Sequence, residues 1–367
     1  MRITAYMIFI ILTVAGHYFA WQLILKAWPQ LKIKKYYILI GLALISFIFV
    51  ASFALLHIVE SSFLAMVYTI FAVLFGLLTQ LMLFGFLFFI RSILVTKIAC
   101  LKAKCIFPNT KKVAQSFIVI VVVFFLLGTY NAFFPRVKTI NLDSDKISSI
   151  GEETSFVHLS DIHLGAIYRP FYLERIAKQV NKLKADYIII SGDLFDGSDM
   201  QLEEFIPALK SFLAPVIFVP GNHDVYILEK EILTTTESAG IFTLSDEAII
   251  IDDVEIIGFN YVSHGDSNIR RVIDNLQVNK DNYRIVVNHV PVDHAEALAL
   301  EADLMLSGHS HRGQIFPFSL VTNWIYGKYA YGLENYENML VYTSAGTGTW
   351  GPPLRTLLPG EIILFKF

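Results

Sequence analysis

The sequence predicts a large α/β domain that follows an N-terminal bundle of about four transmembrane helices. The chain has 367 residues, of which 55% are hydrophobic, and a mean hydropathy of +0.56, which is too apolar for an ordinary soluble enzyme. Long uncharged apolar runs stand before residue 135. After about residue 150, short apolar strands alternate with amphipathic helices, which is the pattern of an α/β domain.

The charge distribution places a domain boundary just after the last apolar run. Residues through Phe134 contain eleven Lys and Arg and one acid, whereas the remainder contains 18 Lys and Arg and 31 acids. We therefore expect a transmembrane region over 1–135, a linker over 136–152 and a second domain over 153–367. The acidic balance of that domain indicates no nucleic-acid surface, because phosphate backbones are bound by clustered Lys and Arg.

Four apolar runs without Asp, Glu, Lys or Arg are candidates for crossing a membrane. They are residues 4–25, 37–58, 63–90 and 114–134. Each is at or above the roughly 20 residues that cross the hydrocarbon core. We expect a multi-pass protein of the cell (inner) membrane, with the lipid bilayer as its first partner.

The charges of the connections predict an orientation. The first and third connections carry four and six Lys or Arg, whereas the second carries none. The positive-inside rule therefore places the first and third connections in the cytoplasm. With four spans, both termini are then outside, and the C-terminal domain is expected to be extracytoplasmic.

The C-terminal half divides into one clear helix and a series of short strands. Pro170 begins a helix that runs to about Lys184, with Leu173, Ile176 and Val180 on one face. The predicted strands are 156–159, 187–191, 216–219, 248–251, 254–259, 284–288, 304–307, 340–344 and 361–366. The tyrosine-rich segment 327–342 is interpreted as a surface hairpin, with an apolar substrate entrance as the alternative.

Five small polar clusters each follow one of these apolar strands. They are Asp161-Ile-His163, Gly192-Asp193, Gly221-Asn222-His223-Asp224, His289 and Gly308-His309-Ser310-His311. Functional groups of α/β folds are placed just beyond the carboxyl ends of strands. Carboxylate, imidazole and amide groups together suit a divalent Mn, Fe, Zn or Ni ion. Each cluster alone is weak, but five in this order, each behind a strand, are hard to explain by packing.

In this order the clusters resemble the calcineurin-like metallophosphoesterase superfamily. The stretches LMLSGHSHRGQIFP, TSAGTGTWGPPLR and PGEI resemble its bacterial membrane-associated branch, and the resemblance covers about residues 155–367. The resemblance implies an αββα four-layer sandwich of two mixed sheets and a phosphoesterase activity. The membrane region carries no such motif and is interpreted from hydropathy alone.

The resemblance also implies a set of ligands for two divalent metal ions. Asp161, His163 and His311 would hold one ion. Asn222, His289 and His309 would hold the other, and Asp193 would bridge both. Two ions about 3.5–4 Å apart lower the pKa of a shared water, and the resulting hydroxide attacks phosphorus in line.

Four further residues receive expected roles in catalysis or substrate binding. By the resemblance, His223 protonates the leaving alkoxide and Asp224 orients its imidazole, although Asp224 is alternatively a plain turn residue. Arg312 stands where the branch usually has glycine, so it either grips a substrate phosphate or points to solvent. Arg355 is a second candidate phosphate contact.

The leading functional hypothesis is a metal-dependent phosphodiesterase or phosphomonoesterase. Its substrate is a phosphate ester or pyrophosphate, on a small molecule or on a lipid, because the domain is anchored to a membrane. One alternative is a pyrophosphatase of the UDP-2,3-diacylglucosamine type that faces the cytoplasm. The other is a non-catalytic metal-binding sensor or transport-associated protein. Metal-dependent turnover of an aryl phosphodiester separates the enzyme from the sensor.

Overall fold

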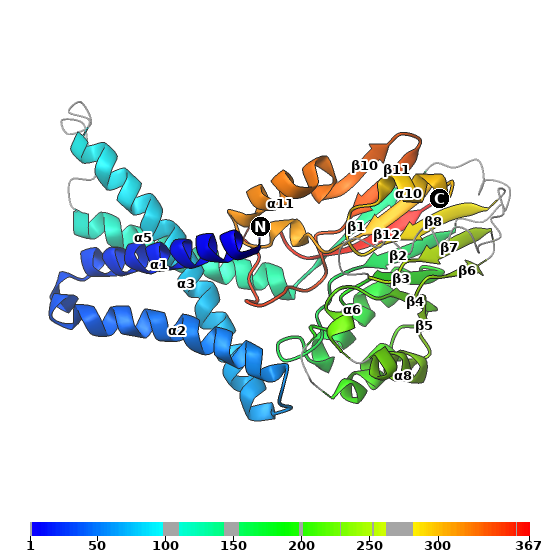
Figure 1. The fold of residues 1–367 in the computed structure, drawn as a ribbon, viewed down its shortest axis with the longest axis horizontal. Helices are drawn as coiled ribbons and strands as arrows, with labels where there is room; N and C mark the ends of the chain where they lie inside the picture. Colours follow the sequence, from blue (N-terminus) through cyan, green and yellow to red (C-terminus); the bar gives the residue numbers. More distant parts are fainter. Residues whose placement is uncertain are drawn as a thin grey trace. The chain divides into compact units, whose positions relative to one another are not determined.

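The chain folds into two compact units. In Figure 1 the first unit consists of helices, and the second consists of strands with helices. The computed structural model describes residues 2–97, 110–142, 154–197, 201–227, 229–251, 253–261, 282–356 and 358–367. The first unit consists of Met1–Leu55, Ser62–Thr129 and Pro352–Leu354. The second consists of Leu56–Ser61, Tyr130–Gly351 and Arg355–Phe367.

The first unit is built of long apolar helices. They are α1 (Arg2–Ala27), α2 (Lys35–Leu56), α3 (Ser62–Lys97) and α5 (Thr110–Phe133), and the short 3-10 helix η1 (Pro29–Lys34) precedes α2. A Cβ at Gly85 of α3 would lie 2.5 Å from the carbonyl oxygen of Phe19 in α1, so these two backbones approach closely. Small residues permit such approaches between helices that have no water to expel.

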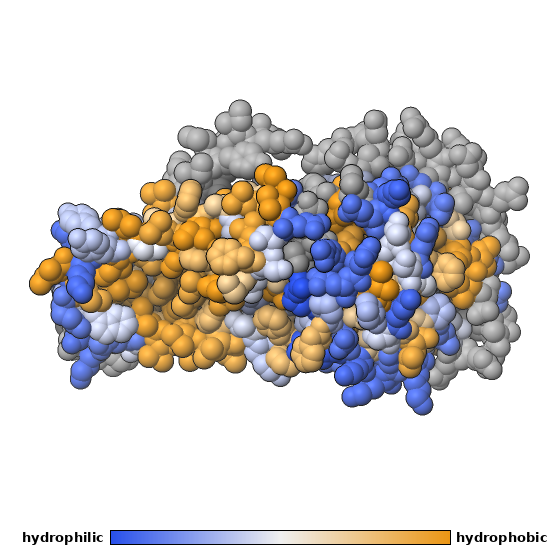
Figure 2. All heavy atoms as spheres, turned by 90° about the horizontal axis from the view of Figure 1, so that it is seen from below, coloured by the Kyte–Doolittle hydropathy of each residue, from blue (hydrophilic) through white to orange (hydrophobic). Residues whose placement is uncertain are grey.

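Three segments of the described chain are long and apolar enough to cross a membrane, and this corrects the expected count of about four. They are Pro29–Leu56, Ser62–Val95 and Thr110–Phe133. Helix α1 does cover the first predicted run, but the side chains of its first half lie outside the described residues. The remaining part, which begins at Thr13, is shorter than the roughly 20 residues that a crossing requires. Figure 2 shows apolar side chains covering much of the visible surface of these helices.

The second unit contains two mixed sheets of six strands each. The first sheet has the order β1-β12-β2-β3-β4-β5 and the second β10-β11-β9-β8-β7-β6. The strands of the first sheet are β1 (Arg136–Asn141), β12 (Glu361–Lys366), β2 (Ser155–Leu159), β3 (Tyr187–Ser191), β4 (Val216–Val219) and β5 (Phe242–Thr243). Those of the second are β10 (Gly332–Tyr336), β11 (Met339–Thr343), β9 (Leu304–Ser307), β8 (Tyr283–Val287), β7 (Val254–Gly258) and β6 (Glu247–Ile251).

Three apolar cores hold these layers together. The central core joins the inner faces of both sheets, for example Ile189 of β3 and Ile285 of β8. A second core packs the outer face of the first sheet against α6 (Pro170–Asn181) and α7 (Ile206–Leu209). A third packs the outer face of the second sheet against α10 (His294–Ala299). Helices therefore cover both outer faces, as the resemblance implied, because the apolar faces of the central strands are removed from water in this way.

Most predicted elements are confirmed within one or two residues. The hairpin expected in 327–342 is β10 and β11, which pair antiparallel. The main difference lies in the segment that we expected to be a linker. Residues Arg136–Asn141 form β1, which pairs in parallel with β12 at the edge of the first sheet. Five of its six side chains are not buried, so its sequence lacks the apolar run by which the other strands were recognised; residues 143–153 lie outside the described residues.

Candidate metal centre

The seven predicted ligands meet where strands of both sheets end. Asp161 follows β2, Asp193 follows β3 and Asn222 follows β4, all in the first sheet. His289 follows β8, and His309 and His311 follow β9, both in the second sheet. The carboxyl ends of these strands open on a common edge, and the loops beyond them carry the ligands inward.

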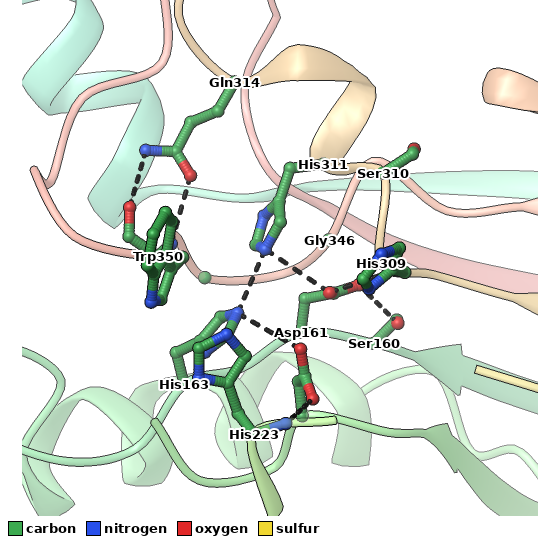
Figure 3. Close-up of polar contacts among 12 residues, drawn as sticks. Ser160, Asp161, His163, His223, His309, Ser310, His311, Gln314, Gly346 and Trp350 are labelled. Atoms are coloured by element: carbon green, nitrogen blue, oxygen red, sulfur yellow. Dashed lines mark hydrogen bonds and ion pairs between the residues drawn. The ribbon is translucent and has the colours of Figure 1, made fainter. Parts of the chain in front are cut away.

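One group of ligands comes from the loops after β2 and β9. The Nε2 atoms of His163 and His311 lie 3.0 Å apart, and His311 Nε2 lies 3.4 Å from Asp161 Oδ1. Figure 3 shows the two imidazoles and the carboxylate pointing toward one another. Two hydrogen bonds fix the position of the Asp161 carboxylate. Ser160 Oγ–H donates to it at 2.5 Å, and the His309 backbone N–H donates to it at 3.1 Å.

The second group comes from the loops after β3, β4, β8 and β9. His289 Nε2 lies 3.1 Å from both Asp193 Oδ2 and Asn222 Oδ1. His309 Nδ1 lies 2.7 Å from Asn222 Oδ1. Asp193 Oδ2 also lies 3.8 Å from His163 Nε2, so this carboxylate stands between the two groups.

The donor set fits divalent metal ions. Two imidazole Nε2 atoms that face each other at 3.0 Å have no good mutual hydrogen bond when both are neutral acceptors, whereas both can direct a lone pair at a cation. His289 Nδ1–H donates to the Ser191 carbonyl at 2.8 Å, which leaves Nε2 directed into the cluster, where a bound cation would take the place of its proton. Such backbone contacts fix the tautomer of metal-binding histidines.

The backbone at these positions is held in an uncommon conformation. Asp161, His163, Asp193, His309 and His311 all have φ between 46° and 64°. The left-handed region is disfavoured for residues with a Cβ and persists where the surrounding structure over-determines it. Five of seven predicted ligands therefore share a strained backbone, which is typical of a functional site.

A glycine beside the ligands allows two of the ligand-bearing loops to approach each other. A Cβ at Gly308 would overlap Ser160 Oγ and Asp161 Oδ2. The loop after β9 can therefore approach the loop after β2 only because residue 308 has no side chain.

The buried charges of the cluster shift one another's pKa. Burial alone raises the pKa of Asp193, but the neighbouring imidazoles, His289 first, outweigh it and lower that pKa below its usual range. Burial lowers the pKa of His289, and the Asp193 carboxylate reverses this and raises it to about 10. Burial raises the pKa of Asp161 to about 6, against the opposing effect of His289. Burial also lowers the pKa of both His163 and His311, which keeps them neutral and able to act as ligands.

His223 is oriented by a different group from the one expected. Its Nδ1–H donates to the Asp196 backbone carbonyl at 3.0 Å, and its ring lies 4.9 Å from the His163 ring. The buried Asp224 carboxylate instead accepts backbone N–H groups of Phe195 at 2.9 Å and Gly221 at 2.7 Å. Asp224 therefore joins the loops after β3 and β4, because unpaired N–H groups in this buried region must find an acceptor.

Arg355, the second residue expected to contact phosphate, lies beside the His311 ligand, and its guanidinium donates to backbone carbonyls of the loop after β11. Its side chain is buried, and its Nη2 donates to the carbonyls of Ala345 and Gly348 at 2.5 Å each. The same nitrogen lies 3.4 Å from His311 Nδ1. Arg355 thus folds the loop after β11 under the His311 ligand.

Arg312 is less buried than Arg355. It lines a surface pocket that also includes His311, Phe316, Arg355 and Leu358. Its guanidinium lies over the Tyr331 ring, with Cζ 4.1 Å from the ring centre.

Two residues of the site had no role in the sequence interpretation. Gln314 donates from Nε2 to the Trp350 carbonyl at 3.1 Å and accepts the Trp350 N–H at 3.0 Å. This pair of hydrogen bonds, drawn in Figure 3, places the Trp350 ring 5.7 Å from the His223 ring. Both residues lie in the stretches GHSHRGQIFP and TGTWGPP, so their presence in those motifs was the available signal.

Comparison with known proteins gives a consistent result. The family described as calcineurin-like phosphoesterase matches residues 154–313. A metallophosphoesterase of Helicobacter pylori is 30% identical over 63% of this chain and 64% of its own length, so the chain spans less than two thirds of that relative. Metallophosphoesterase YkoQ of Bacillus subtilis is 30% identical over 60% of this chain and 86% of its length. A zebrafish (Danio rerio) protein described as a transmembrane protein with metallophosphoesterase domain is 29% identical over 67% of this chain and 60% of its length.

Proposed function

The chain belongs to the calcineurin-like metallophosphoesterase family, and we propose that it hydrolyses phosphate esters at the candidate metal centre while anchored in a membrane. The observation that carries this proposal is the convergence of Asp161, His163, Asp193, His289 and His311 with their ligand atoms within a few ångströms. Four strand-end loops do not bring such groups together in a buried cluster for packing alone.

The geometry favours the ligand assignment that the resemblance implied. Asp161, His163 and His311 would hold one divalent ion, and Asn222, His289 and His309 the other. Asp193 stands between the groups and is suited to bridge them. Once bound, the two ions would supply an activated water and positive charge for the phosphate oxygens.

His223 is the proposed general acid. Its Nδ1–H is bonded to the Asp196 carbonyl, which accepts that proton whether the ring is neutral or charged. The proton that the ring exchanges is therefore the one on Nε2. We propose that Nε2–H protonates the leaving alkoxide, while the Asp196 carbonyl keeps the ring plane fixed.

Arg312 is the proposed contact for the substrate phosphate. It lies on the pocket wall beside the His311 ligand, and its cation is held over Tyr331 rather than over a carboxylate. Guanidinium groups bind phosphate in a bidentate manner. The apolar pocket residues Phe316 and Leu358 would accommodate a non-polar part of the substrate.

The test is metal-dependent hydrolysis by the full-length protein in detergent. With Mn²⁺, bis(p-nitrophenyl) phosphate should release p-nitrophenol, and chelation should stop the release. Asp193→Ala should lose at least about a hundredfold, because it removes the carboxylate between both sets of ligands. His294→Gln serves as the matched control, since His294 packs on Tyr329 and Tyr336 away from the cluster. No Mn²⁺-dependent turnover, or equal turnover by Asp193→Ala, would favour the non-catalytic sensor instead.

The charge pattern still supports an extracytoplasmic catalytic unit with three spans. The basic segments lie at the start of Pro29–Leu56 and between the other two spans, whereas residues 57–61 contain no Lys or Arg. The positive-inside rule then places the chain after Phe133 outside the cytoplasm. The number of spans before this point changes only the side on which the N-terminus lies.

A further inference from the structure

Helix α11 (Phe318–Tyr326) presents a large apolar surface to solvent. Trp324 is 84% exposed, Leu320 61% and Ile325 57%, and Phe318 and Val321 are each about half exposed. The one buried residue of this helix, all of which is described, is Ser319. Single exposed apolar residues are ordinary, but five in one short helix mark a surface that is covered by something.

The chemistry of this surface suits a lipid membrane. Residues 304–333 contain no Asp or Glu, and they contain Arg312 and Lys328. Lys328 is exposed just after the helix ends. An apolar helix flanked by cations and carrying an exposed tryptophan is typical of a segment that lies in the lipid headgroup region.

Contacts within the second unit place α11 near the point where a membrane span ends. The last turn of α5, Tyr130–Phe133, belongs to this unit. In it, Asn131 Nδ2–H donates to the Arg355 carbonyl at 3.3 Å, and the residue after Arg355, Thr356, donates its N–H to the Gln314 carbonyl at 3.1 Å. Thr356 Oγ1 also accepts the N–H of Phe316 at 2.7 Å, two residues before α11 begins.

The stretch of chain between this candidate span and the second unit is also short. Helix α5 ends at Phe133 and β1 begins at Arg136, so the catalytic unit starts within three residues of a candidate span. The segment that begins α11 is therefore tied by one loop to the place where the chain leaves the membrane. Of the possible occupants of the apolar face, these contacts favour the lipid of that membrane.

We propose that α11 lies in the surface of the membrane and that the pocket beside it receives phosphate esters of membrane lipids. Phe316 and Ser319 line the pocket together with His311 and Arg312, so the start of the helix forms one of its walls. A lipid headgroup at that surface reaches the metal centre without leaving the bilayer. The substrate class rests on the proposed function, whereas the membrane contact of α11 does not.

The contact is tested by fluorescence quenching of the full-length protein in nanodiscs. Lipids brominated near the headgroup quench tryptophans that lie within the membrane surface. The wild type contains four tryptophans, so the contribution of Trp324 is the difference from Trp324→Phe. This difference should be quenched by the brominated lipid. An unquenched Trp324, including one that is shielded by a second copy of the chain or by another protein, overturns the proposal.

The substrate class is tested with two esters that release the same product. Phosphatidyl-p-nitrophenol in vesicles is compared with soluble bis(p-nitrophenyl) phosphate. The double variant Leu320→Gln, Ile325→Gln should lose about tenfold on the lipid ester, because apolar contact with the membrane is weakened. It should retain wild-type turnover of the soluble ester. Leu213→Gln is the matched control, since Leu213 is 83% exposed on the same unit outside α11.

The outcomes separate the two proposals. Unchanged turnover of both esters by the double variant, or an equal loss on both, overturns the membrane role of α11. A wild type that turns over neither ester removes the proposed function. In that event the Trp324 quenching still decides whether α11 contacts lipid.

Discussion

At the residue scale, the sequence predicted the types of side chain in the candidate site but not all of their hydrogen-bond partners. His223 and Asp224 are adjacent, so an imidazole oriented by its neighbour was the natural interpretation. In the fold, the Asp224 carboxylate turns to the N–H groups of Phe195 and Gly221, and the Asp196 carbonyl takes the position at His223 Nδ1. Adjacent residues in a tight turn often point in different directions, because their Cβ vectors differ.

Replacing His223 should therefore lower activity, whereas replacing Asp224 should lower stability. His223→Gln should lower kcat with little change in stability, and the loss should be larger for an alkyl ester than for a p-nitrophenyl ester, which leaves without a proton. Asp224→Ala should lower the free energy of unfolding by about 1–3 kcal/mol, since buried N–H groups lose their acceptor. Steady-state kinetics on both esters and chemical unfolding measure the two effects. Equal kinetic losses on both esters would remove His223 as the acid.

The burial of His158 should make the stability of the folded chain depend on pH. It is buried in β2 and its Nε2 lies 2.7 Å from Ser191 Oγ, and burial lowers its pKa from 6.5 to about 3. The unfolded chain binds this proton below pH 6.5 and the folded chain does not. Stability should therefore be full above pH 6.5 and fall as the pH decreases toward 3, with a slope of up to ~1.4 kcal/mol per pH unit.

His158→Gln should remove that slope. The comparison is made by unfolding both proteins at about pH 7, 6 and 5 in the presence of a chelator, so that metal release does not contribute. The variant should lose less stability than the wild type over this range. Parallel curves would show that His158 is already protonated in the folded chain.

At the element scale, the ends of the strands were predictable and their cross-strand pairs were not. Arg284 of β8 lies opposite Glu255 of β7 in the sheet register, and its Nε donates to Glu255 Oε2 at 2.8 Å. Both side chains are almost fully buried. In the sequence they are two charges within otherwise apolar strands, and nothing local indicates that they face each other.

Breaking this pair should destabilise the catalytic unit strongly. Glu255→Ala leaves the Arg284 cation buried without its carboxylate, which costs about 3–5 kcal/mol. The double variant Glu255→Leu, Arg284→Met should recover most of that loss, because two apolar side chains need no partner. Urea unfolding in detergent measures both. A single variant as stable as the wild type would mean that water reaches this position.

At the scale of the whole molecule, candidate membrane spans and the candidate metal centre lie in one chain. Three candidate spans precede a domain whose first strand, β1, begins three residues after the last span ends. Only Phe134 and Pro135 stand between α5 and β1, whereas the composition suggested a longer linker. If α5 spans the membrane, so short a connection agrees with the proposal that the substrates lie at or near that surface.

The proposed orientation of the chain is predicted from its loop charges. A reporter fused after Phe367 should behave as exported, for example as active alkaline phosphatase and inactive β-galactosidase. Replacing the Lys residues between the second and third spans by Gln should weaken this orientation. A cytoplasmic signal from the wild-type fusion would reverse the proposed topology and revive the nucleotide-sugar substrate.

The sequence by itself determined three of the four predicted apolar spans, most of the strands and the ligand types that follow them. Those features depend on local periodicity and on spacing along the chain, which can be read directly. Only the tertiary structure showed that Arg355 binds the loop after β11 and that Asp224 joins the loops after β3 and β4. It also showed that β1 is an edge strand of the first sheet. A charged or polar group satisfies its hydrogen bonds with whatever the fold brings near. For Arg355 those partners are backbone carbonyls, which carry no trace in the side-chain sequence.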